Sequence, residues 1–202
     1  MIRNIVFDFG NVLVRFEPEK YLMNFVDSWD EAKRISDLVF LSKPWKDGDR
    51  GLMERDAIID QMCLDNPADA DVIRRAITPC NEMLTMPEDT PVFLHELQQA
   101  GYHLYYISNT NDSAYTWMRA HHPILSELEG GIASFQDGII KPCPEIFQLL
   151  LSRYQLKAEE CLFVDDMAEN TKAAMEEGYQ ALTLPGAEAL RACLTERLGL
   201  KK

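Results

Sequence analysis

The sequence lacks the long apolar segments that membrane insertion requires. No stretch of its 202 residues reaches the roughly 18 consecutive apolar residues of a membrane span. The N-terminus also lacks the charged region, apolar run and small-residue cleavage site of a secretory signal peptide. Hydrophobic residues nevertheless make up 47% of the chain, enough for a sizeable core. We therefore expect a globular, cytoplasmic protein that does not bind membranes.

Cysteine and positive charge are also sparse. The five cysteines are odd in number and form neither a CxxC motif nor a Cys/His metal spacing, so we expect reduced, mostly buried thiols. Twenty Lys and Arg residues stand against 33 Asp and Glu residues, which gives a formal charge of −13. This charge repels nucleic acid at long range, whereas local donors or a metal would still allow a small anionic ligand to bind. Neither the charge nor the motif spacing indicates an oligomeric state.

Short apolar segments alternate with helical patterns along most of the chain. We expect strands at residues 4–7, 102–108, 161–164 and 181–184, because each is a near-continuous apolar run. Between them, prolines suited to a first helical turn and glycines suited to a helix end mark the helices. The alternation predicts an α/β fold with a Rossmann-like, doubly wound parallel sheet covered by helices on both faces.

The interval after the first strand has a different character. From about residue 17 to residue 85 it contains helical patterns and no convincing strand. An inserted helical bundle is the simplest interpretation. We therefore divide the chain into a core domain of residues 1–15 and 86–202 and a small helical cap domain of residues 16–85.

Polar residues follow four segments that we expect to end at one edge of the sheet. Asp8 follows the first strand, Ser108–Thr110 follows the segment YHLYYI, Lys141 follows the segment ASFQDGII, and the pair Asp165 and Asp166 follows CLFV. In parallel sheets, ligands bind beyond the carboxyl ends of the strands. Taken singly, most of these residues are explained as caps, turns or surface charge. The acidic pair is more specific, because adjacent carboxylates repel unless a cation or protons compensate them.

Together these residues suit the hydrolysis of a phosphate ester. Such a reaction requires a nucleophile, a divalent cation and fixed donors that hold the phosphoryl group. Asp8 is an oxygen nucleophile that also binds Mg²⁺, and the Asp165–Asp166 pair completes a hard-oxygen site. Ser108 and Lys141 are donors for a phosphate dianion. The set is more informative than any of its members.

The motifs DFGNV, ISNT, IIKPCPEIF and FVDDMAEN follow one another over nearly the whole chain. In order and context they resemble motifs one to four of the haloacid dehalogenase superfamily of hydrolases, in the subclass with a helical cap. The first two motifs are similar to those of bacterial glucose-1-phosphatase-type sugar phosphatases. This resemblance implies an Mg²⁺-dependent phosphatase that acts on a small phosphorylated metabolite, a sugar phosphate such as glucose 1-phosphate, through an aspartyl-phosphate intermediate.

The resemblance also implies a role for each matching residue, with Asp8 as the nucleophile. The expected magnesium ligands are the carboxylates of Asp8, Asp166 and, directly or through water, Asp165, and the backbone carbonyl of Gly10. The expected phosphate-binding residues are Ser108, Asn109 and Lys141. Asn170, one helical turn beyond the acidic pair, would orient that pair; a solvated helix position is an equal alternative for Asn170.

Gly10 departs from the superfamily pattern. Most phosphatases of this superfamily have a second Asp two residues after the nucleophile, which protonates the leaving oxygen and later activates water. Such assistance is worth about 10² to 10⁴ in rate. Its loss matters unless the leaving group is good, as the anomeric hydroxyl of a sugar 1-phosphate is, or unless an acid enters from the cap. The candidates for that acid are Glu17, Asp47, Asp49 and Glu54, for which solvated surface charge is the alternative.

The segment PWKDGDRGLM in the cap is expected to be a loop that contacts the substrate. Trp45, Lys46 and Arg50 would stack on or hydrogen-bond a sugar. The alternative is a turn between helices with Trp45 in the cap core.

Two other functions are compatible with the motifs. A 2-haloacid dehalogenase-type hydrolase uses an Asp nucleophile but needs no magnesium site, so the Asp165–Asp166 pair and Lys141 favour phosphate. A catalytically weak protein that binds a phosphorylated metabolite for regulation would account for Gly10. The intact Asp8 and Lys141 disfavour this second alternative.

Overall fold

The structure, a computed structural model that describes residues 1–200, contains one five-stranded parallel sheet in that range. The strands are β1 (Asn4–Phe7), β2 (His103–Ser108), β3 (Gly130–Ala133), β4 (Cys161–Asp165) and β5 (Gln180–Thr183). Their order across the sheet is β3-β2-β1-β4-β5. The chain adds strands on one side of β1 and then returns to add β4 and β5 on the other. The topological switch point, where ligands bind in such folds, therefore lies between β1 and β4.

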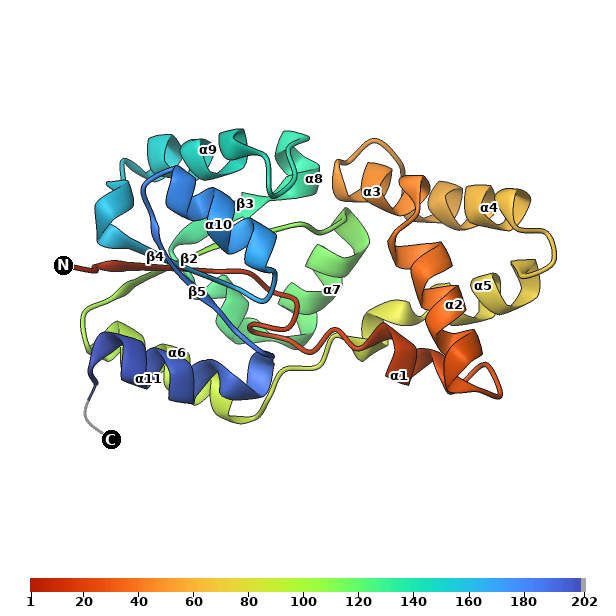
Figure 1. Ribbon diagram of the computed structural model, residues 1–202, viewed down its shortest axis with the longest axis horizontal. Coiled ribbons are helices and arrows are strands. Elements are labelled where there is room, and N and C mark those ends of the chain that lie inside the picture. Colours follow the sequence, from red (N-terminus) through yellow and green to blue (C-terminus); the bar gives the residue numbers. More distant parts are fainter. Residues whose placement is uncertain (201–202) are drawn as a thin grey trace.

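Helices cover both faces of this sheet (Figure 1). They are α6 (Asp89–Gln99), α7 (Asp112–His121), α8 (Ser134–Asp137), α9 (Pro144–Tyr154), α10 (Ala168–Glu176) and α11 (Leu190–Leu198), with 3₁₀ turns η2 (Pro123–Ser126), η3 (Ala158–Glu160) and η4 (Ala187–Ala189). Ile5 and Phe7 of β1 pack with residues of α6, α7 and α11, whereas Val6 packs with residues of α9 and α10. Successive strand residues point to opposite faces, so burial of both faces requires an unbroken apolar strand. The predicted doubly wound α/β fold is confirmed.

The sequence patterns do not predict strand β3, although the other four strands agree with expectation to within one residue at each end. Strand β3 begins with two glycines, which are poor strand formers. Close contacts with two tyrosines explain why glycine is required at both positions. A Cβ on Gly130 would lie 2.3 Å from the Tyr154 hydroxyl, and a Cβ on Gly131 would lie 2.4 Å from the Tyr106 carbonyl oxygen.

The segment ASFQDGII does not form the strand that the sequence interpretation assumed. Only its first residue belongs to β3, and the next four form helix α8. Lys141 therefore lies in a loop beyond a helical turn rather than directly after a strand.

A helical bundle, which we call the cap, follows β1 and lies beside the sheet (Figure 1). It consists of α1 (Pro18–Leu22), α2 (Trp29–Phe40), α3 (Lys43–Asp49), α4 (Arg55–Asp65), α5 (Ala70–Ile77) and the 3₁₀ turn η1 (Cys80–Met83). Its buried apolar residues, among them Ile35, Met62 and Ile73, form a separate hydrophobic cluster. The domain boundaries at 15/16 and 85/86 stay predictions. Every helix described for residues 1–200 is too short or too polar to cross a membrane.

Helix α3 occupies most of the segment that was expected to be a loop. The Ser42 hydroxyl accepts a hydrogen bond from the Trp45 backbone N–H at 3.1 Å, and Pro44 suits the first turn of the helix. Gly48 is an unfavourable helix residue, but a Cβ there would lie 2.3 Å from the Ile58 side chain. Close packing of α3 on α4 therefore explains a glycine that, in the sequence alone, indicates a turn.

The cap contacts the core at two places besides the chain crossings. After α3, the Asp49 carbonyl accepts a hydrogen bond from the Ser134 hydroxyl at 2.6 Å. Gly51, in a left-handed conformation with φ +69°, lies so close to the core that a Cβ would be 2.2 Å from the Phe135 carbonyl oxygen. At the start of α4, the Arg55 guanidinium donates to the Ser113 hydroxyl at 2.7 Å. These contacts seat the cap over one end of the sheet.

We predict that Gly51→Ala lowers the free energy of unfolding more than Gly101→Ala does. A left-handed backbone costs a non-glycine residue about 1–2 kcal/mol, and only the Cβ at Gly51 would also overlap a carbonyl. Gly101 is the matched control, because its φ is +90° but no heavy atom lies within 4 Å of the added Cβ. Urea unfolding measures both. Equal losses would show that the turn after α3 does not press on the core.

Candidate active site

Segments that are far apart in the sequence meet at the carboxyl edge of the sheet. Asp8 follows β1, Asp165 ends β4, and Asp166 comes next; one carboxylate oxygen from each lies within 4.8 Å of the other two. Lys141 reaches the same point from the loop after α8. Its Nζ lies 2.9 Å from Asp8 Oδ2 and 2.6 Å from Asp165 Oδ2. We call these four side chains the catalytic cluster.

Burial controls the charges within this cluster. The side chain of Lys141 is only 1% exposed. Burial alone lowers the pKa of Lys141, but the charges of Asp8 and Asp165 outweigh it and the pKa is raised. Burial raises the pKa of Asp8 to about 6, with Asp165 acting in the same direction and Lys141 in the opposite one. The ammonium group is thus held charged, and its removal would leave buried carboxylates uncompensated.

The loop that carries Lys141 is fixed by Asn109. The Asn109 side chain donates from Nδ2 to the Lys141 carbonyl at 3.0 Å and accepts from the Lys141 backbone N–H at 2.8 Å. This side chain therefore orients Lys141, which the motif match did not anticipate. Ser108 is the buried last residue of β2, and its hydroxyl acts to lower the pKa of Asp8.

The two adjacent carboxylates have different surroundings. Asp165 is fully buried and accepts hydrogen bonds from the Met167 backbone N–H at 2.8 Å and from Asn170 Nδ2 at 3.0 and 3.2 Å, besides its contact with Lys141. Asp166 is half-buried, and its Oδ2 accepts from Asn11 at 3.0 Å. Asp166 therefore retains more free oxygen lone pairs for a cation. Asn170 lies against Asp165 rather than against both members of the pair.

Asn11 is a site residue to which the sequence interpretation gave no role. It adopts a left-handed conformation with φ +52°, which Asn tolerates better than most residues. Its Oδ1 accepts from the Phe16 backbone N–H at 2.9 Å, and its Nδ2 is thereby directed to Asp166. The available signal was Gly10-Asn11, a pair typical of tight turns.

Glycine at position 10 is not required by crowding or backbone strain. A Cβ there would lie 3.7 Å from Phe16 Cβ, an ordinary van der Waals distance, and the φ of Gly10 is outside the left-handed region. The lack of a second acid is therefore a chemical property of the site rather than a packing consequence. Use of the Gly10 carbonyl as a metal ligand stays a prediction.

Three of the four carboxylates considered as replacement acids lie in solvent or are paired within the cap. Glu17 is exposed and pairs with Lys20 at 3.1 Å. Asp47 pairs with Lys43, and Glu54 is exposed at the start of α4.

Asp49 differs from these three, because it lies at the end of α3 where the cap meets the core. Burial raises the pKa of Asp49 to about 7; a hydrogen bond from the Asn111 side chain acts in the opposite direction, and the negative charge of Asp8 adds to the increase. Among the four candidate acids, Asp49 is thus the one whose pKa is raised by the charge of Asp8, the proposed nucleophile.

The expected sugar-binding residues of the cap do not form a group in the structure. The Trp45 ring packs edge-on against Phe40, with ring centroids 4.7 Å apart, and joins the cap core. Lys46 is exposed, and Arg50 is half-buried at the end of α3. For Trp45 the structure supports the alternative that the sequence left open.

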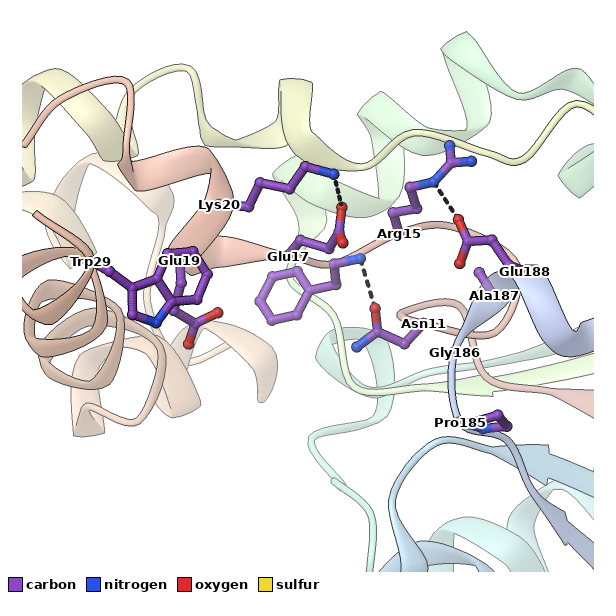
Figure 2. A pocket seen from close by; sticks show the side chains of 11 residues that line it. Asn11, Arg15, Glu17, Glu19, Lys20, Trp29, Pro185, Gly186, Ala187 and Glu188 are labelled. Carbon is purple, nitrogen blue, oxygen red and sulfur yellow. Dashed lines mark hydrogen bonds and ion pairs between the residues drawn. The ribbon is translucent and has the colours of Figure 1, made fainter.

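A cavity of about 400 Å³ lies between the cap and the core (Figure 2). Asn11 and Phe16 line it together with Trp29 of the cap and residues 185–188 of the core. Its charged lining residues are Arg15, Glu17, Glu19, Lys20 and Glu188. Because Asn11 also bonds Asp166, the cavity adjoins the acidic cluster. The Trp29 residue is 54% exposed and leaves an aromatic surface available to a ligand.

The catalytic cluster fits a magnesium ion. Its three carboxylates carry three negative charges when ionised, and Lys141 supplies one positive charge. The remaining two negative charges match a divalent cation, and carboxylate oxygens are the ligands that Mg²⁺ prefers. The excess negative charge also contributes to the raised pKa of Asp8.

The chain belongs to the haloacid dehalogenase-like hydrolases, whose family model matches residues 2–176. It is 26% identical to a D-ribitol-5-phosphate phosphatase of Bacteroides thetaiotaomicron, over 89% of this chain and 90% of that protein. It is also 26% identical to the sesquiterpene phosphatase astK of Aspergillus oryzae, over 95% of this chain and 93% of that protein.

Solved structures share the same fold. A haloacid dehalogenase family enzyme of Bacteroides thetaiotaomicron, in complex with magnesium and inorganic phosphate, superposes with a TM-score of 0.74 at 25% identity, over 91% of this chain and 94% of that one. The L-2-haloacid dehalogenase of Xanthobacter autotrophicus superposes with a TM-score of 0.65 at 17% identity, over 100% of this chain and 84% of that one. The predicted superfamily is confirmed.

We predict that Lys141→Met lowers the free energy of unfolding by about 3–5 kcal/mol, because it leaves buried carboxylates without their partner. Lys172→Met is the control. The side chains of Lys172 and its partner Glu176 are 75% and 66% exposed, so loss of this surface pair should cost less than about 1 kcal/mol. Urea unfolding in metal-free buffer measures both. A small loss for Lys141→Met would contradict the buried charge pairing.

Proposed function

We propose that the chain is an Mg²⁺-dependent phosphatase that hydrolyses a small phosphomonoester through an aspartyl-phosphate intermediate. The observation that carries this proposal is the catalytic cluster, in which Lys141 is buried against Asp8 and Asp165 with Asp166 adjacent. A nucleophile, a cation site and a cationic donor to phosphate are thereby within reach of one phosphoryl group. The two phosphatases that align with most of the chain support this reaction.

In this proposal a carboxylate oxygen of Asp8 attacks phosphorus, and the bond from phosphorus to the leaving oxygen breaks with its electron pair. Lys141 and Ser108 hold the phosphoryl oxygens during the transfer. A bound magnesium ion supplies charge neutralisation of those oxygens. Water then attacks the aspartyl phosphate, which restores Asp8 and releases phosphate.

We infer that the ester is a sugar or polyol phosphate rather than an apolar one. The cavity beside the cluster carries charged groups of both signs, which suit hydroxyl groups, and Trp29 offers a face for stacking. The relative named for D-ribitol-5-phosphate agrees with this inference. A sesquiterpene group, as in the name of the other relative, would bury the charged residues of the cavity without hydrogen-bond partners, which is unfavourable. Glucose 1-phosphate and a cytoplasmic location stay predictions from the sequence.

We predict that the protein hydrolyses p-nitrophenyl phosphate only with Mg²⁺ and with Asp8 intact. EDTA should abolish turnover and excess Mg²⁺ should restore it, because without the cation the carboxylates repel a phosphate dianion. Asp8→Asn, which removes the nucleophilic oxygen, should lower kcat by at least about 10³-fold. The colour of released p-nitrophenolate at neutral pH measures each case.

Two results would favour the alternatives. Halide release from a 2-haloacid in EDTA, without phosphatase activity, would support a dehalogenase. Equal inertness of the wild type and Asp8→Asn with Mg²⁺ would support a regulatory protein that binds a phosphorylated metabolite.

We predict that kcat/KM ranks glucose 1-phosphate and ribitol 5-phosphate above farnesyl phosphate by at least about tenfold. Trp29→Ala should lower kcat/KM for the better polyol ester by up to about tenfold, the value of one aromatic contact. Leu64→Ala, at a residue that is 75% exposed and outside the cavity lining, is the control. A preference for farnesyl phosphate would overturn the inferred substrate class.

A further inference from the structure

The proposed reaction requires a proton that the catalytic cluster does not supply. When the bond from phosphorus to an alkyl oxygen breaks, the leaving oxygen must gain a proton, and water must later lose one. Asp8 is consumed as the nucleophile, and Gly10 has no side chain. Lys141 is already engaged with two carboxylates. A separate acid must therefore face the leaving group.

The backbone of Asp49 is held at the carboxyl edge of the sheet by a core residue. Its backbone carbonyl accepts from the Ser134 hydroxyl at 2.6 Å, and the Asn111 side chain and the charge of Asp8 both influence the pKa of its carboxyl group. Asn111 caps α7 by accepting the Ala114 backbone N–H on Oδ1 at 3.0 Å. Its amide NH₂ group is thereby left to donate to Asp49.

This placement puts an acid of the cap above the strand ends of the core. Asn111 follows β2 and Ser134 follows β3, so both anchors lie on the edge where Asp8 follows β1. Asp49 as a residue is partly exposed rather than fully buried. It is not among the residues that line the cavity beside Phe16 and Trp29, so the leaving oxygen would have to lie between the end of α3 and Asp8.

We propose that Asp49 is the general acid and base of the reaction, in place of the acid absent at position 10; this rests on the proposed phosphatase function. As Asp8 displaces the alcohol, the carboxyl proton of Asp49 passes to the leaving oxygen, and the products of this step are the alcohol, the aspartyl phosphate and the Asp49 carboxylate. That carboxylate then removes a proton from the attacking water. The P–O bond to Asp8 breaks, phosphate leaves, and Asp49 is again protonated.

The environment of Asp49 supports both halves of this cycle. Burial raises its pKa to about 7, so the acid and the carboxylate are both populated near neutral pH. Donors and acceptors of this pKa are the most effective at that pH. Asp47, only two residues earlier, instead forms an ion pair with the exposed Lys43 of the same helix.

The test compares esters that differ in their need for a proton. Phenyl phosphate, p-nitrophenyl phosphate and 2,4-dinitrophenyl phosphate have successively better leaving groups, and kcat/KM reports the steps up to departure of the phenol. Asp49→Asn should lower kcat/KM for phenyl phosphate by about 10² to 10⁴ but for 2,4-dinitrophenyl phosphate by less than about tenfold. Loss of the base should also produce a burst of one dinitrophenolate per protein, followed by slow turnover.

Asp47→Asn makes the same chemical change outside the site and should leave all three values near those of the wild type. Thermal unfolding of both variants establishes that they are folded. Equal losses on all esters, no loss, or the same pattern in Asp47→Asn would overturn the role of Asp49. Failure of the wild type to hydrolyse any of the three with Mg²⁺ would instead overturn the phosphatase function.

Discussion

The rest of the site depends on the burial of the Lys141 ammonium between Asp8 and Asp165. A buried ammonium is stable only when carboxylates compensate it, and a buried carboxylate has the reciprocal requirement. The pairing joins the ends of β1 and β4, and Asn109 at the end of β2 fixes the loop that carries the lysine. These contacts therefore link three strand ends beside the topological switch point. The same pairing leaves Asp166 with unused negative charge, which a divalent cation would balance.

The sequence predicts the parts of the fold that depend on local pattern. Four strands are largely apolar runs, and β1, β2 and β4 are almost wholly buried, so these strands can be found without tertiary information. Strand β3 cannot be recognised from the sequence because it begins with Gly130 and Gly131. These glycines are required by close contacts with Tyr154 and Tyr106, which are distant in sequence. Helix α3 is hidden for a similar reason, since Gly48 indicates a turn until its contact with Ile58 is known. Tertiary packing overrode local propensity in both places.

The candidate site divides in the same way. Asp8, Asp165 and Asp166 follow strands of one parallel sheet, so their convergence with Lys141 follows from topology and was predicted. The sequence cannot separate Asp49 from Asp47, because both are cap aspartates on one short helix and only the docking of that helix decides which one faces Asn111. It likewise drew attention to Trp45 rather than Trp29, since exposure of an aromatic ring depends on how the helices pack.

An acid in the cap changes which leaving groups are compatible with glycine at position 10. With no acid at all, the chemistry would be restricted to good leaving groups, which is the argument for a sugar 1-phosphate. With Asp49 as the proton donor, an ordinary primary alcohol becomes an accessible leaving group, and a polyol phosphate is as reasonable chemically as glucose 1-phosphate. The acid then reaches the phosphoryl group only while the turn from Asp49 to Gly51 is seated against Ser134 and Phe135. Proton transfer and exclusion of water would thus be coupled through a single contact between cap and core.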